Sequence, residues 1–63
     1  MPFEVLDPIV LAEDLPALGL KRGDMGAIVE VYTPEDFEVE FVTASGRTQA
    51  LTTLHVSQLR PVG

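Results

Sequence analysis

The sequence predicts an all-β fold for one small domain, on the basis of three observations. Short apolar runs of about strand length recur along the chain, each bounded by turns that contain glycine or proline. The segment Phe37–Val42 alternates apolar and acidic residues with the period of two that a half-buried strand requires. No segment has the periodicity of an amphipathic helix of useful length. With 63 residues there is room for a single domain over residues 1–63 with one core.

The first two strands are expected on either side of a long loop. Val5–Ala12 is apolar and rich in β-branched residues, which favours a strand. Pro8 lies inside it and cannot donate to a ladder, so we expect an edge strand or a bulge here. Glu13–Asp24 holds one proline and two glycines and is expected to be the long loop. Met25–Tyr32 follows a glycine-rich turn as the second strand.

The second half of the chain predicts three more strands. In the third strand the two phenylalanines and the valine between them are expected to face the core, while Glu38 and Glu40 face water. The expected elements in order are a turn at Thr33–Asp36, a strand at Phe37–Val42, a turn at Thr43–Arg47, a strand at Thr48–Leu54, a 3₁₀ turn at His55–Gln58 and a closing strand at Leu59–Val62.

This order of elements is that of an SH3-like barrel: an opening strand, a long loop, three strands joined by tight turns, a 3₁₀ turn and a closing strand. A closed or nearly closed barrel would also remove the strand edges through which a small sheet aggregates. We therefore predict a small five-stranded SH3-like barrel. An open antiparallel sheet is the alternative.

The composition excludes several function classes. Ten acidic residues against four basic ones give a net charge of −6, which disfavours binding to nucleic acid or to an anionic membrane surface. The acid excess indicates either solubility or an electrostatic match to a basic partner. The chain has no cysteine, and therefore no disulfide or thiolate metal site. Because no apolar run is long enough for a transmembrane helix and the N-terminus has no basic leader region, we expect a cytoplasmic protein.

No catalytic, cofactor-binding or metal site is expected. Ser57 lies two residues from His55, the only histidine, but a surface turn accounts for both. The paired carboxylates fall in loops or point outward from a strand, and a barrel this small is filled by its own side chains. The glycines do not form a phosphate-binding loop. With no Trp and one Tyr, an aromatic groove for proline-rich peptides is not expected either.

Three segments together resemble a known bacterial family. They are the opener Leu6–Leu11 with Glu13–Pro16, the glycine turn Gly19–Gly26, and the end Ser57–Val62. On these the chain resembles the family known as domain of unknown function 4926, over nearly its whole length. The resemblance implies an SH3-like fold and no established activity. A looser resemblance, through Lys21–Val31, is to the KOW motif of ribosomal and transcription-elongation proteins.

Three leucines in the long loop suggest where a partner could bind. In one interpretation Leu15 and Leu20 only cap the open end of the barrel. In the other, Leu18 joins Leu15, or Tyr32 and Ile28, in an apolar patch ringed by acids. The candidate partner-binding residues are Asp14, Leu15, Leu18, Leu20, Ile28 and Tyr32.

The function predicted from these observations is a non-catalytic protein-interaction module. Its partner is expected to be a protein, in particular a basic one, bound through the Asp14–Leu20 loop and the outward side of Met25–Tyr32, as for an acidic antitoxin or an accessory protein. Two alternatives stay open. One is a KOW-like nucleic-acid-binding domain that uses Lys21, Arg22 and Arg47, and the other is an accessory subunit that assembles with itself.

Overall fold

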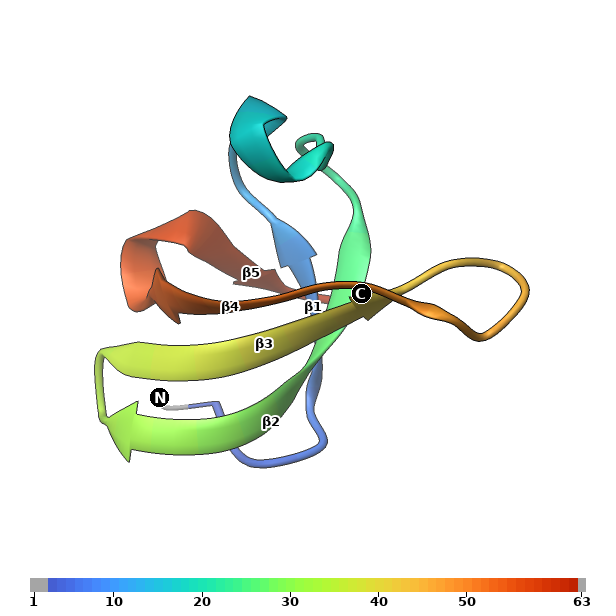
Figure 1. Ribbon diagram of the computed structural model, residues 1–63. Coiled ribbons are helices and arrows are strands. Elements are labelled where there is room, and N and C mark those ends of the chain that lie inside the picture. The colour runs from blue at the N-terminus through green and yellow to red at the C-terminus, as the bar shows by residue number, and fades with distance from the viewer. Residues whose placement is uncertain (1–2, 63) are drawn as a thin grey trace.

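The computed structural model describes residues 3–62 and places five strands in one antiparallel sheet of order β4-β3-β2-β1-β5 (Figure 1). Two 3₁₀ turns, η1 and η2, complete the described elements. The bounds are β1 (Pro8–Leu11), η1 (Pro16–Leu18), β2 (Met25–Thr33), β3 (Asp36–Val42), β4 (Thr48–His55), η2 (Val56–Gln58) and β5 (Leu59–Pro61). The all-β class, the long loop after the first strand and the 3₁₀ turn before the last are confirmed.

The opening strand is shorter than the sequence predicts, because the chain turns before it. The Asp7 backbone N–H donates to the Glu4 carbonyl at 3.0 Å, and the Asp7 carboxylate accepts from the Glu4 N–H at 2.8 Å. Leu6 has a left-handed backbone within this turn, with φ of 77°. The strand therefore begins at Pro8 and not at Val5. The expectation of an edge strand or a bulge at Pro8 was wrong, because β1 pairs with both β2 and β5 without a register shift. Proline suits the first position of a strand, where its missing N–H costs no ladder bond.

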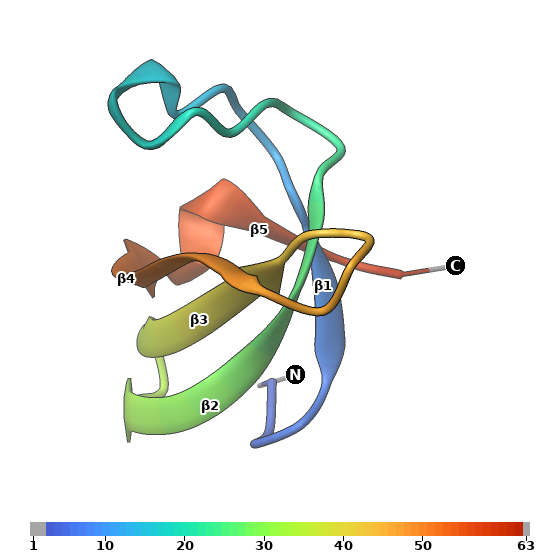
Figure 2. The same ribbon diagram turned by 45° about the vertical axis from the view of Figure 1, so that its right-hand side comes forward.

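The edges of the sheet are β4 and β5. Among residues 3–62 no ladder joins these two strands, so closure into a barrel stays a prediction. Figure 2 shows the sheet strongly curved, with β2 and β3 sweeping across from β1 and β5. In both views the long loop stands at the top of the molecule and the turn before β1 at the bottom, while the β2–β3 turn lies at the left (Figures 1 and 2).

The core lies on the concave side of the curved sheet. The predicted inward residues of β3, Phe37, Val39 and Phe41, are all buried, as the alternation requires. The ring of Phe3 meets that of Phe37 edge-on at 5.7 Å, a favourable aromatic geometry. The other buried apolar side chains come from the remaining four strands and from the long loop: Ile9, Leu11, Leu20, Ile28, Leu54 and Leu59.

Candidate functional site

The long loop is closed on itself by its own hydrogen bonds. The Asp14 carboxylate accepts from the Arg22 backbone N–H at 2.8 Å. Leu15 and Leu20 exchange two backbone hydrogen bonds, of 2.9 and 3.1 Å, around η1. Leu20 is only 2% exposed and belongs to the core, and Leu15 packs against that core. These contacts agree with the capping interpretation, and of the loop leucines Leu18 alone is exposed.

The structure does not bring the six predicted residues together. Ile28 is fully buried, so like Leu20 it offers no surface to a partner. Tyr32 is exposed, but it lies at the far end of β2 from the long loop, ~20 Å from Met25 along an extended strand. The prediction of a joint patch with Leu18 was therefore wrong in its geometry.

A β-bulge explains the error at Ile28. In a regular strand Ile28, Glu30 and Tyr32 would share one face. The register between β2 and β3 shifts between Ile28 and Glu30, and the residue between them has no direct partner. The shift leaves Ile28 in the core and turns Glu30 and Tyr32 outward. No pattern in the sequence around this position indicates the bulge.

The outward side of β1 to β4 forms a continuous surface, which we call the outer face. One row of cross-strand partners runs across it, because Pro8 pairs with Ala27, Ala27 with Glu40 and Glu40 with Leu51. Directly opposed side chains in such rows lie about 5 Å apart. Besides Tyr32, three large apolar residues on this face are more than half exposed: Met25 at 58%, Val42 at 51% and Leu51 at 57%.

Carboxylates are set among these apolar side chains. Glu38 accepts a hydrogen bond from the Thr53 hydroxyl at 2.7 Å and a longer one from the Tyr32 hydroxyl at 3.4 Å. Glu40 accepts from the Thr48 hydroxyl at 2.7 Å. These neighbours leave both glutamates half-buried, although each points outward as predicted.

The acidic surroundings perturb Tyr32. The pKa of its phenol is raised above the ordinary 10.0, first by partial desolvation and then by the negative charges of Glu38 and Glu30 and the hydrogen bond to Glu38. Desolvation disfavours the charged phenolate, and the neighbouring carboxylates disfavour it further by repulsion and by the hydrogen bond to the neutral phenol. The hydroxyl therefore stays a hydrogen-bond donor at physiological pH.

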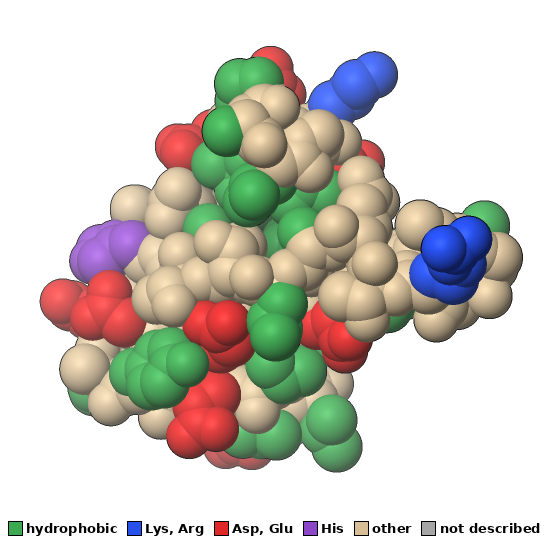
Figure 3. All heavy atoms as spheres, in the orientation of Figure 1, with side chains coloured by type: hydrophobic (Ala, Val, Ile, Leu, Met, Phe, Trp, Pro, Cys, Tyr) green, Lys and Arg blue, Asp and Glu red, His purple; other side chains and the backbone are tan. Residues whose placement is uncertain are grey.

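The positive charges lie away from the outer face of β2, β3 and β4. These three strands contain no Lys or Arg, whereas they carry Glu30, Asp36, Glu38 and Glu40. Figure 3 shows acidic and apolar side chains interleaved over the lower part of the molecule, where β2 and β3 run. The Lys and Arg side chains visible from this side stand over the long loop and over the β3–β4 loop (Figure 3). Among residues 3–62 the one ion pair within 4.0 Å is His55–Glu35, at 3.9 Å.

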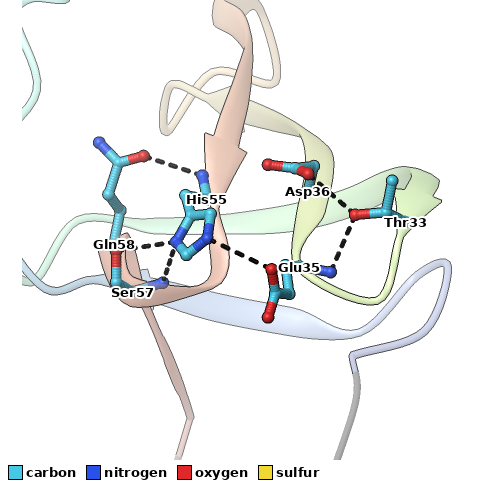
Figure 4. Close-up of polar contacts among 6 residues, drawn as sticks. All are labelled: Thr33, Glu35, Asp36, His55, Ser57 and Gln58. Carbon is cyan, nitrogen blue, oxygen red and sulfur yellow. Dashed lines mark hydrogen bonds and ion pairs between the residues drawn. The ribbon is translucent and has the colours of Figure 1, made fainter.

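A second polar cluster lies where β4 runs into η2 (Figure 4). The Nδ1 atom of His55 lies 3.0 Å from the Ser57 hydroxyl and accepts from the Ser57 backbone N–H at 3.2 Å. In turn, the side-chain oxygen of Gln58 accepts a hydrogen bond from the His55 backbone N–H at 2.9 Å. The three residues thus form a capping box that satisfies the free N–H groups at the start of η2. The cluster is exposed, and its hydrogen bonds are those that a cap requires.

Other kinds of site find no support in the part of the chain that the structure describes. Within it, no group of three or more His, Cys, Asp or Glu side chains could hold a metal ion. No buried side-chain polar atom there lacks a hydrogen-bond partner. Nor does any helix in residues 3–62 have the length and apolar character needed to cross a membrane.

The fold and this surface define a small all-β domain whose most distinctive feature is an acidic and apolar sheet face. The chain belongs to the family described as Domain of unknown function (DUF4926), whose model matches residues 5–61. The resemblance found in the sequence is thereby confirmed. No curated protein and no solved structure matches the chain.

Sequence reasoning missed the apolar members of the outer face. Met25, Val42 and Leu51 each alternate with a core-facing neighbour, and this alternation is visible in the sequence. For β3 the acidic residues show which of the two alternating sets of side chains faces the solvent. The alternation is blurred in β4, where threonines occupy both sides. The signal that could have found the site is therefore the cross-strand register, which only the structure supplies.

Proposed function

We propose that this protein is a non-catalytic protein-interaction module whose partner is a basic protein. The observation that carries the proposal is the outer face, where large apolar side chains are exposed among carboxylates and no Lys or Arg lies on β2, β3 or β4. Exposed apolar surface set among polar groups is typical of protein interfaces. Uncompensated carboxylates favour an oppositely charged partner and repel acidic ones.

The net charge of −6 supports the same proposal. A basic protein would be drawn to this chain at long range and held by the apolar contacts at short range. Shielding of a basic neighbour, as small acidic antitoxins do, is one role that such a surface would serve.

The nucleic-acid alternative has less support. Lys21 and Arg22 belong to the long loop, Arg47 to the β3–β4 loop and Arg60 to β5, so the four cations form no stripe along one strand. Binding to a phosphate backbone depends on several such contacts at once. Self-assembly through the outer face is disfavoured as well, because two copies would bring like charges together.

The proposal is tested by capturing partners from a lysate of the native organism with the tagged chain at moderate salt. We expect one stoichiometric companion, a basic protein, to be released as the salt concentration rises. Glu30→Lys should weaken the capture, because it reverses a charge on the outer face. Glu4→Lys is the matched control, since Glu4 is also exposed and lies outside the sheet.

Two results would contradict the proposal. One is recovery of nucleic acid in place of a protein. The other is an empty capture together with light scattering that shows a homo-oligomer of the tagged chain.

A further inference from the structure

A shallow depression in the outer face lies over the β1–β2–β3 junction. It is lined by Pro8, Met25, Gly26, Ala27, Glu40 and Val42. The lining is apolar apart from the one carboxylate, and Leu51 extends it on the β4 side as the cross-strand neighbour of Glu40. A single carboxylate in an otherwise apolar lining is typical of a specific binding site, because the apolar surface provides affinity and the polar group determines which ligand binds.

The Glu40 carboxylate has binding capacity to spare. Its Oε2 atom accepts one hydrogen bond, from the Thr48 hydroxyl at 2.7 Å. No Lys, Arg or His nitrogen within residues 3–62 lies within ion-pair distance of it. An ionised carboxylate offers about four acceptor positions, so most of the capacity of Glu40, which lines the depression, is unused within residues 3–62. A cationic group is the ligand that fits these positions best.

The surroundings of Glu40 further restrict that cation. Met25, Ala27 and Val42 would contact the methylene stem of a lysine or arginine while its charged end meets the carboxylate. The exposed apolar side chains on both sides, Met25 and Leu51, would contact apolar neighbours of that residue. A small inorganic cation would leave this apolar surface uncovered.

From this geometry we infer that the depression binds a polypeptide segment of the partner in which a lysine or arginine lies between apolar residues. The inference rests on the proposed function and specifies its site and its ligand class. It places the contact on Met25, Ala27, Glu40, Val42 and Leu51, and not on the long loop.

The test uses the full chain labelled with ¹⁵N and a synthetic peptide, acetyl-Ala-Val-Lys-Leu-Ala-amide, as the probe. A second peptide carries acetyl-lysine in place of lysine, which removes the charge and keeps the stem. We expect the lysine peptide to shift the amide signals of residues 25–27, 40–42 and 51. The acetylated peptide should bind about three- to fivefold more weakly, as expected for loss of a partly exposed ion pair.

Two matched variants separate the site from the overall charge. Glu40→Gln removes one negative charge, and its amide oxygen can still accept from Thr48. Glu13→Gln removes the same charge elsewhere, and it can likewise still accept from Gln58, which lies 3.1 Å from Glu13. We expect Glu40→Gln to weaken binding of the lysine peptide about three- to fivefold and Glu13→Gln to leave it unchanged. Leu51→Thr, at an exposed strand position, should weaken the binding of both peptides about equally, because it removes an apolar contact and no charge.

Three outcomes would overturn the inference. In the first, the lysine peptide binds but shifts signals of the long loop, which rejects this site while the proposed function stands. In the second, both glutamate variants weaken binding equally, so that only net charge matters. In the third, neither peptide shifts any signal while the native basic partner is still captured, which rejects this ligand class alone.

Discussion

Gly26 is the position where the structure makes its sharpest claim about stability. A Cβ atom added there would lie 2.8 Å from the Glu40 carbonyl oxygen and 2.8 Å from two ring carbons of Phe41. Real Cβ atoms essentially never approach other heavy atoms so closely. The Phe41 ring is buried and the carbonyl belongs to the backbone of β3, so neither can move away freely. Gly26→Ala should therefore destabilise the protein.

The magnitude follows from two opposing effects. Forcing a methyl group into a packed core costs about 1–3 kcal/mol. Alanine recovers about 0.5–1 kcal/mol of backbone entropy relative to glycine within a strand. The net loss in the free energy of unfolding is about 1–2 kcal/mol. For a domain of this size that loss lowers the Tm by about 5–15 °C.

Urea unfolding and thermal unfolding of Gly26→Ala, each followed by circular dichroism, measure this loss. Gly46→Ala is an informative control, because nothing lies within 4 Å of its added methyl group. Gly46 has φ of 86°, so its cost is purely conformational and Gly46→Asn should relieve part of it. In a Phe41→Leu background, Gly26→Ala should cost less free energy of unfolding than it does in the parent protein. Gly46→Ala should cost the same in both backgrounds. A Gly26→Ala protein as stable as the parent would refute the packing argument.

Three further predictions concern the turn before β1, Tyr32 and the η2 cap. Leu6 is 77% exposed and has φ of 77°, a left-handed conformation that asparagine adopts more readily than leucine. Leu6→Asn should therefore raise the free energy of unfolding by about 0.5–1 kcal/mol, and an unchanged urea midpoint would contradict this prediction. The Tyr32 phenol, followed by its ultraviolet absorbance, should ionise above pH 10.0, and Glu38→Gln should lower its pKa. Because the folded pKa is raised, the stability from this group is complete below pH 10.0 and is lost as pH rises through the folded value. His55→Ala should lower the free energy of unfolding by about 1 kcal/mol, because it removes the cap. Ser57→Ala should lower it less, because the backbone N–H of residue 57 keeps His55 as its partner. Equal losses for the two variants in chemical unfolding would contradict the cap.

The sequence was most informative where one face of a strand is clearly exposed to solvent. The acids of β3 identified its solvent side, and Phe37, Val39 and Phe41 were correctly predicted as core residues. The β2–β3 and β3–β4 turns were equally clear, because Pro34 marks the first and Gly46 the second, whereas the turn before β1 contains neither residue type and was missed. The β2 and β3 bounds differ from the prediction by one residue each.

The candidate site was harder to predict, for a physical reason. Its residues are brought together by cross-strand register, which depends on bulges that no short motif encodes. Ile28 was assigned to the surface because the bulge after it was not foreseen. Leu20 was assigned to the surface because a loop leucine has no periodic neighbours to reveal its burial. The depression around Glu40 combines residues from β1, β2 and β3, so only the folded sheet reveals it.

The central claim is that the outer face, and not the long loop, contacts a protein partner. Methyl cross-saturation on the complex with the captured partner tests it most directly, because Met25, Val42, Leu51 and Leu18 all carry exposed methyl groups. We predict that saturation of the partner's protons attenuates the methyl signals of Met25, Val42 and Leu51 and leaves that of Leu18 unchanged. Attenuation at Leu18 with no change at the other three would contradict the account.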